Sequence, residues 1–132
     1  MAQEILVIVK EPLTGDMIEA GRAVIGRLDR YKFPITAALW LYESERGYWR
    51  LLLASPKRGE EGSLKTYQRV FGILREEPFE GFSYIDLHIS VVDAKDPLIS
   101  GLRKAVKRSD VRWGGPVNGT YVEDAYIYRT AA

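Results

Sequence analysis

Apolar residues recur along this 132-residue chain in different periods, and each period indicates a type of element. The continuous apolar run at residues 5–9 predicts a short buried strand. Farther along, a helical spacing of three and four predicts a helix over residues 15–30, in which Asp16 and Glu19 stand in capping-box spacing. The positions on its apolar face are Met17, Gly21, Val24, Ile25 and Leu28.

A β-hairpin is predicted by two apolar and aromatic runs, residues 35–43 and 48–54, which are joined by the polar, glycine-containing segment 44–47. Apolar residues at nearly every position indicate that both faces of this hairpin are covered. The pairing that this loop favours sets Glu43 opposite Tyr48, Tyr42 opposite Trp49 and Trp40 opposite Leu51.

The middle of the chain predicts a loop, a helix and a strand. Residues 57–62 are polar and indicate a loop, after which Ser63 is placed to cap a helix that ends before Pro78. Its apolar positions are Leu64, Tyr67, Val70, Phe71 and Leu74. Residues 84–92 alternate between apolar and polar, which is typical of a strand with one solvated face.

The last third predicts one more helix and a final strand. Asp93 or Asp96 can cap a helix with Pro97 in its first turn and an apolar face that reaches Val106. The glycine-rich residues 109–119 indicate a loop that closes on the turn Asn118-Gly119. Residues 120–129 then form a strand.

These elements predict one α+β domain over residues 1–132, with a mixed, mainly antiparallel sheet of four or five strands and three helices. The order β-α-β-β-α-β-α-β begins like a ferredoxin-like split unit. That analogy depends on the strand at residues 5–9 and fails without it.

Composition limits the function classes. Nineteen basic and eighteen acidic residues give a formal charge of +1, so the molecule as a whole has no field that favours nucleic acid or an anionic membrane. Without cysteine there is no disulfide or thiolate chemistry, which fits a cytoplasmic protein. Charges or glycines interrupt every apolar stretch, and we expect no membrane insertion.

Candidate catalytic residues are few. Asp86, His88 and Ser90 are the residue types of a hydrolytic triad, but alternate positions on one strand point in parallel and do not converge. One histidine without cysteine argues against a zinc site. No glycine-rich phosphate-binding or dinucleotide-binding motif is present, so we expect no cofactor and no metal.

The adjacent carboxylates Glu123 and Asp124 face opposite sides of the predicted last strand, so one of them points towards the interior. A buried carboxylate needs a partner, for which Arg129 and Arg50 are candidates. A structural ion pair and a catalytic or metal-binding role both remain open from the residues alone.

Basic residues concentrate in the segment 103–113, where an aromatic residue follows them. Such a patch can grip a phosphate backbone and stack a base, although cations at a helix C-terminus also stabilise the helix dipole. The candidate nucleic-acid-binding residues are Arg103, Lys104, Lys107, Arg108, Arg112 and Trp113.

Aromatic residues of the predicted hairpin form the second candidate surface. They fit either core packing or an interface with a second copy or another protein. These candidate interface residues are Trp40, Tyr42, Tyr48 and Trp49.

Several stretches of the chain resemble a small bacterial protein family with no assigned function. They are Leu39-Trp40-Leu41-Tyr42, Trp49-Arg50-Leu51, and Asn118-Gly119 together with Glu123 to Arg129. Because that family has no assigned activity, the resemblance implies no catalytic residue and no ligand.

Three functional hypotheses follow from the sequence. The first is a non-enzymatic binding or regulatory module that acts through a protein partner or as a homodimer. The second is nucleic-acid binding through the basic segment 103–113, and the third is a metal-dependent hydrolase or nuclease.

Overall fold

The computed structural model describes residues 10–130, so the strand predicted over residues 5–9 lies outside the described range. In chain order, the elements are α1 (Gly15–Arg30), β1 (Ala37–Glu43), β2 (Tyr48–Ser55), α2 (Pro56–Glu61), α3 (Ser63–Leu74), the 3-10 turn η1 (Tyr84–Leu87), β3 (Ile89–Asp93), α4 (Pro97–Ala105), β4 (Val111–Val117) and β5 (Thr120–Arg129).

Helix α1 has the bounds that the helical period predicts, but its cap is different. The hydroxyl of Thr14 accepts a hydrogen bond from the backbone N–H of Met17 at 3.2 Å, so Thr14 is the N-cap and the predicted Asp16–Glu19 capping box is wrong. Arg30 is the last helical residue and Tyr31 is the C-cap, after which Lys32 adopts a left-handed conformation with φ 59°.

The β1–β2 hairpin confirms both the predicted strands and the predicted register. Glu43 lies opposite Tyr48, Tyr42 opposite Trp49 and Trp40 opposite Leu51. As predicted, side chains of this hairpin enter apolar clusters on both faces of the sheet.

Two predictions after the hairpin need correction. The expected loop 57–62 is instead the short helix α2, because Ser55 caps it through the N–H of Lys57 and Pro56 occupies its first position. Ser63 is the first residue of α3 rather than its cap, since Gly62, at φ 84°, holds the N-cap position.

The strand predicted over residues 84–92 is divided in the structure. Residues 84–87 form η1, His88 adopts a left-handed conformation with φ 49°, and only Ile89–Asp93 pairs as β3. Because Ile85 and Leu87 lie in the 3-10 turn and not in a strand, they do not share one face, and Ile85 is 71% exposed while Leu87 is buried.

The predicted helix after Asp96 is confirmed as α4, with the side chain of Asp96 accepting from the N–H of Leu98. The loop predicted over residues 109–119 is wrong, because it contains strand β4. The two-residue turn at Asn118-Gly119 folds β4 back against β5.

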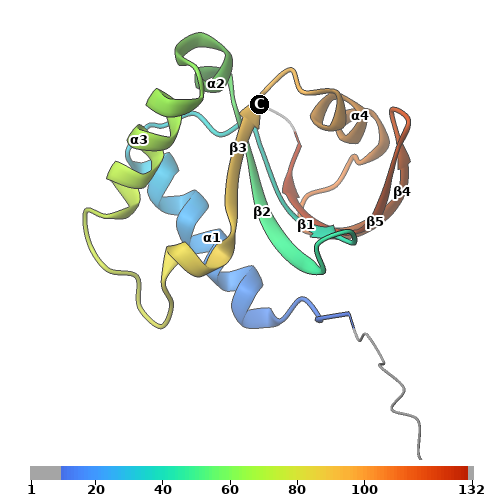
Figure 1. Cartoon of the computed structure of the whole chain (residues 1–132), viewed down its shortest axis with the longest axis horizontal. Helices are drawn as coiled ribbons and strands as arrows, with labels where there is room; N and C mark the ends of the chain where they lie inside the picture. The colour runs from blue at the N-terminus through green and yellow to red at the C-terminus, as the bar shows by residue number, and fades with distance from the viewer. Residues whose placement is uncertain (1–9, 131–132) are drawn as a thin grey trace, which may run out of the picture.

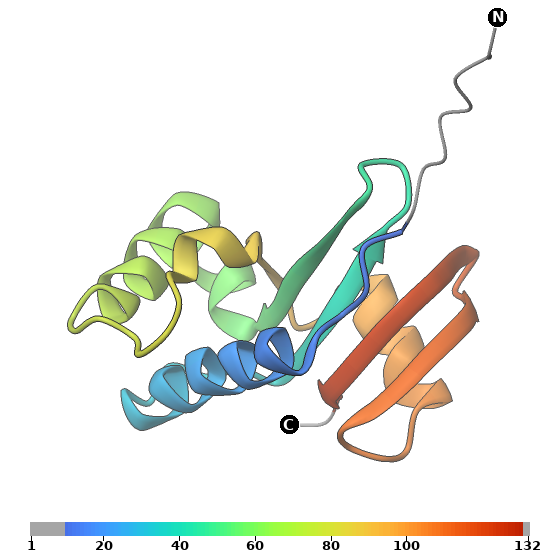
Figure 2. The same cartoon turned by 90° about the horizontal axis from the view of Figure 1, so that it is seen from below.

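The five strands form one sheet in the order β3-β2-β1-β5-β4, in which only β2 and β3 are parallel. Figure 1 shows α1 and α3 on one side of this sheet and α4 on the other, where β1, β5 and β4 curl around it. Figure 2 shows the β1–β2 and β4–β5 hairpins side by side. The α+β class with a mixed sheet is confirmed, with four helices rather than three in residues 10–130.

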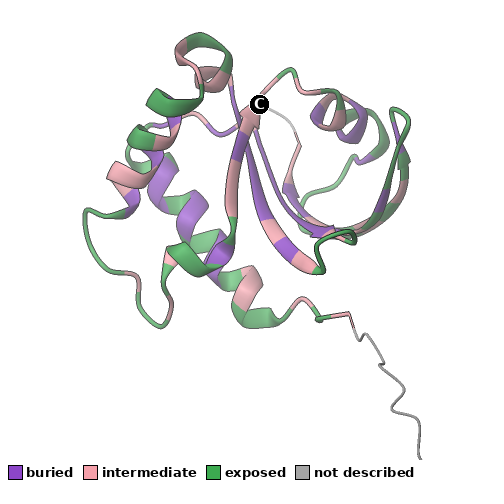
Figure 3. Cartoon of the chain, viewed as in Figure 1, coloured by how far each residue is buried: buried purple, intermediate pink, exposed green. Residues whose placement is uncertain are grey.

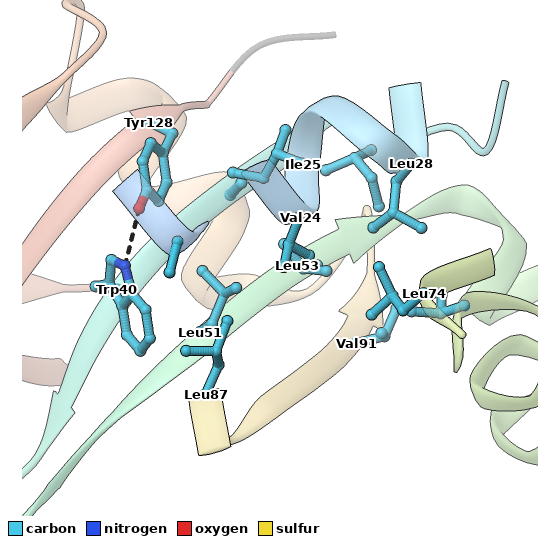
Figure 4. Close-up of a cluster of buried hydrophobic side chains, with 14 of the residues drawn as sticks. Val24, Ile25, Leu28, Trp40, Leu51, Leu53, Leu74, Leu87, Val91 and Tyr128 are labelled. Carbon is cyan, nitrogen blue, oxygen red and sulfur yellow. Dashed lines mark hydrogen bonds between the residues drawn. The ribbon is translucent and has the colours of Figure 1, made fainter. Parts of the chain in front are cut away.

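The two faces of the sheet carry separate cores, which we call the α1 face and the α4 face. Figure 3 shows buried stretches in α1, in the central strands and in α4. On the α1 face, Val24 and Leu28 pack in one buried cluster with Leu51 and Leu53 (Figure 4). On the α4 face, Ile99 and Leu102 of α4 pack with residues of β1, β2, β4 and β5, among them Leu39, Leu52, Val117 and Ile127.

A buried polar link joins α1 to the sheet. The indole Nε1 of Trp40 donates to the hydroxyl of Tyr128 at 2.8 Å, and this hydroxyl donates to the backbone carbonyl of Ile18 at 2.6 Å (Figure 4). Gly21 lets the helix approach this pair, because a methyl group there would overlap the Tyr128 hydroxyl. Burial raises the pKa of Tyr128 above its usual value, so the hydroxyl keeps its proton.

Candidate functional site

The residues of the suggested hydrolytic triad do not share one strand. Asp86 belongs to η1, His88 follows it, and Ser90 lies in β3. His88 instead stacks against Tyr48, with ring centroids 4.3 Å apart. Between residues 10 and 130, no three histidine or acidic side chains gather closely enough to hold a metal ion, and no helix has both the length and the apolar composition to cross a membrane.

Three of the four candidate interface residues are interior. Trp40 and Trp49 are 1% and 2% exposed, and Tyr42 is 9% exposed. These side chains belong to the core on the α1 face and have little surface for a partner. Only Tyr48 is half-buried, beside His88.

The six basic-segment candidates do not form one continuous surface. Arg103 and Lys104 lie in the last turn of α4, and Lys107 and Arg108 follow it. Arg112 of β4 points to the α1 face, where it lies 5.5 Å from the ring of Trp49, whereas Trp113 packs against the core on the α4 face. The sheet therefore separates the ring of Trp113 from the guanidinium of Arg112.

Asp124 is held by two cations on the α1 face. It accepts from Lys10 Nζ at 2.7 Å and from Arg112 at 2.6 Å, and it does not contact Arg129 or Arg50, the predicted partners. Partial burial opposes ionisation, but the hydrogen bonds from Arg112 and Lys10 outweigh it and lower the pKa of Asp124. This arrangement is an ion-pair network that joins β5 to β4 and to the segment before α1.

A cleft of about 410 Å³ opens on the α4 face, and we call it the α4 cleft. Its apolar lining comes from five different elements: Leu41 of β1, Leu52 of β2, Val92 of β3, Leu98 of α4 and Val122 of β5. The other lining residues are Tyr42, a candidate interface residue predicted from the sequence, and Glu43, Ser44, Glu45, Arg50, Asp96, Thr120, Tyr121 and Glu123.

Helix α4 is fixed beside the cleft by short-range contacts at its start. Asp96 caps its first turn, and the side-chain amide of Asn118, in the β4–β5 turn, donates to the carbonyl of Pro97 at 2.7 Å. Gly101 allows the helix to lie directly against β4, since a methyl group there would overlap Val117. These contacts position Asp96 and Leu98 at the edge of the cleft.

A β-bulge places Glu123 at the cleft. The register of β4 and β5 shifts between Trp113 and Gly115, and the backbone of Gly114 passes close to that of Glu123. Val122 and Ala125 consequently both enter the core on the α4 face, although regular alternation would put them on opposite faces. Asp124 then faces the α1 side while Glu123 lines the cleft.

At the hairpin end of the cleft, Arg50 forms an ion pair with Glu43. The Nε atom of Arg50 is buried and has no hydrogen-bond partner among the described residues. The pair joins two adjacent strands and leaves each side chain between a quarter and a third exposed. Sequence reasoning named Arg50 only as a partner for the carboxylates of the last strand and did not predict its pairing with Glu43, for which the local signal was their position on either side of the hairpin turn.

The comparisons with known proteins gave no match: no family model, no curated protein and no solved structure is similar to this chain.

Proposed function

We propose that this chain is a binding module that holds a small molecule with an apolar body in the α4 cleft. The convergence of aliphatic side chains from five elements on one cleft of about 410 Å³ carries this proposal, and this volume lies within the usual range of small-molecule sites, about 300–1,000 Å³. The cleft combines this aliphatic wall with a larger set of polar and charged side chains, so one ligand could contact both kinds of group.

The structure gives less support to self-association through the sheet edges. At the β3 edge, the hydroxyl of Tyr67 accepts from the N–H of Val91 at 2.8 Å. At the β4 edge, Pro116 stands next to the closing pair Val117–Thr120, where its nitrogen faces away from β5 and has no hydrogen to donate. Both edges are thus poor templates for strand addition.

The proposal is tested with a neutral probe, 2-phenylethanol, titrated into ¹⁵N-labelled protein. We expect a dissociation constant on the order of 1 mM, as is usual for a ligand of this size. The amide signals that move should be those of residues at the cleft, such as Leu41, Leu52 and Val122.

A variant that fills the cleft provides the control. Leu98→Trp adds a bulky ring at a half-buried lining position and should remove the shifts, whereas Leu64→Trp, at a position 73% exposed on α3, should leave them unchanged. The amide spectrum of each variant also reports whether it is folded. Equal probe binding by a folded Leu98→Trp protein would overturn the proposal.

A further inference from the structure

The α4 cleft is negatively charged. Among the described residues that line it, four carry carboxylates and one, Arg50, carries a cation. Because Arg50 is already paired with Glu43, its charge is offset within the site. The net negative charge of the cleft therefore comes from Glu45, Asp96 and Glu123.

These three carboxylates form no ion pair within residues 10–130, and Glu45 and Glu123 are exposed. The Oδ1 atom of Asp96 accepts a hydrogen bond from the N–H of Leu98 and so caps α4. A cation beside an apolar wall interacts more strongly with such groups than it does in open water, because the local dielectric constant is lower. The cleft therefore favours a positively charged ligand.

Tyr121 is a second feature of the cleft that favours a cation. Its side chain is 74% exposed and lines the same cleft. An exposed aromatic face attracts ammonium groups through its quadrupole. The apolar lining at Leu41 and Leu52 suits the hydrocarbon part of the ligand rather than a bare ion.

We propose that the ligand of the α4 cleft is a small organic ammonium compound, with its apolar body against Leu41, Leu52 and Val122 and its cation at Glu123, Glu45 and the Tyr121 ring. This inference rests on the proposed function, because it specifies the ligand of the same cleft. Three probes that share a phenylethyl group separate the two proposals: 2-phenylethylammonium, neutral 2-phenylethanol and anionic 3-phenylpropanoate.

The wild-type protein is titrated with each probe at low ionic strength, with amide shifts as the readout. We expect 2-phenylethylammonium to bind about tenfold more tightly than 2-phenylethanol, and 3-phenylpropanoate to bind least. Glu123→Gln and Glu45→Gln should each weaken the ammonium probe about threefold, the size of an exposed charge interaction, and leave the alcohol unchanged. Glu80→Gln removes an exposed carboxylate outside the cleft lining and should leave the dissociation constants of both probes unchanged.

The outcomes distinguish the two proposals. Equal binding of the ammonium probe and the alcohol overturns the cation preference and leaves the binding module standing. Tightest binding of 3-phenylpropanoate overturns it in favour of recognition by Arg50. A pentapeptide with one central lysine that binds more tightly than 2-phenylethylammonium overturns the small-molecule ligand in favour of a protein segment, and no binding of any probe overturns both proposals.

Discussion

The two faces of the sheet are packed to different extents. On the α1 face, α1, α3 and η1 cover the strands, and the large rings of Trp40 and Trp49 fill the space between them. On the α4 face, a single nine-residue helix covers part of the sheet, and the α4 cleft remains beside its N-terminus. The ligand binding proposed for the α4 cleft thus implies a division of roles, in which the α1 face carries the larger core and the α4 face combines its own core with open space.

Neighbouring leucines of β2 give the largest expected difference between the faces. Leu53 is fully buried on the α1 face, whereas Leu52 borders the α4 cleft. We expect Leu53→Ala to lower the free energy of unfolding by about 4 kcal/mol and Leu52→Ala by about 2 kcal/mol, because the second site already adjoins open space. Urea denaturation measures both, and equal losses would contradict the division of roles.

Two glycines of α1 test how tightly the α1 face is filled. Gly21→Ala should lower the free energy of unfolding by about 2 kcal/mol, because the added methyl group overlaps Tyr128 and lies 2.9 Å from the indole nitrogen of Trp40. Gly26→Ala has open space and should raise it by about 0.7 kcal/mol through better helix propensity. Thermal and urea denaturation compare the two variants, and a neutral Gly21→Ala would show that this face is looser than described.

Removal of the Tyr128 hydroxyl tests the polar link within the same face. Tyr128→Phe should lower the free energy of unfolding by about 1.5 kcal/mol, since it removes hydrogen bonds to Trp40 and Ile18 at a buried site. The loss stays moderate because the Trp40 indole retains its hydrogen bond to the backbone carbonyl of Met17, at 3.2 Å. A loss within the error of urea denaturation would mean that the ring, and not its hydroxyl, supplies the stability.

The adjacent carboxylates of β5 give the smallest expected effect. Asp124→Asn should lower the free energy of unfolding by about 0.7 kcal/mol at pH 7, because its cationic partners are partly solvated, whereas Glu123→Gln should change it little. The pKa of Asp124 is lower in the folded state than its ordinary value of 3.8, so its contribution is complete above about pH 4 and is lost as the pH falls further. Urea titrations at pH 7 and pH 2.5 measure the difference in the free energy of unfolding between wild type and Asp124→Asn, which should be smaller at the lower pH.

Local patterns correctly predicted the elements that have a long periodic stretch or an unambiguous turn sequence. The helical spacing over residues 15–30 and the hairpin register at Glu43 and Tyr48 were both confirmed, as was the strand that follows Asn118-Gly119. Prediction failed at residues 84–87, because four alternating residues do not distinguish a strand from a 3-10 turn. It also failed at β4, whose glycine and proline residues resemble a loop and become a strand only by pairing with β5.

The candidate site was less accessible to sequence reasoning than the fold. The α4 cleft combines residues of β1, β2, β3, α4 and β5, and their proximity depends on the position of β5 next to β1 in the sheet. No local period specifies that neighbour. The bulge that places Glu123 at the cleft had one readable signal, the Gly114-Gly115 pair, because glycine in a strand often marks a bulge.

The interior position of β5, between β1 and the edge strand β4, also affects how the protein is made. This strand is the last element of the described chain, yet it lies between β1 and β4 and pairs Ile127 with Leu39. Until residues 120–129 leave the ribosome, β1 has an unpaired edge and β4 has no neighbour in the sheet. The five-stranded sheet is therefore complete only after residue 129 has been synthesised, and a nascent chain that ends at residue 117 is expected to be prone to aggregation and to need a chaperone.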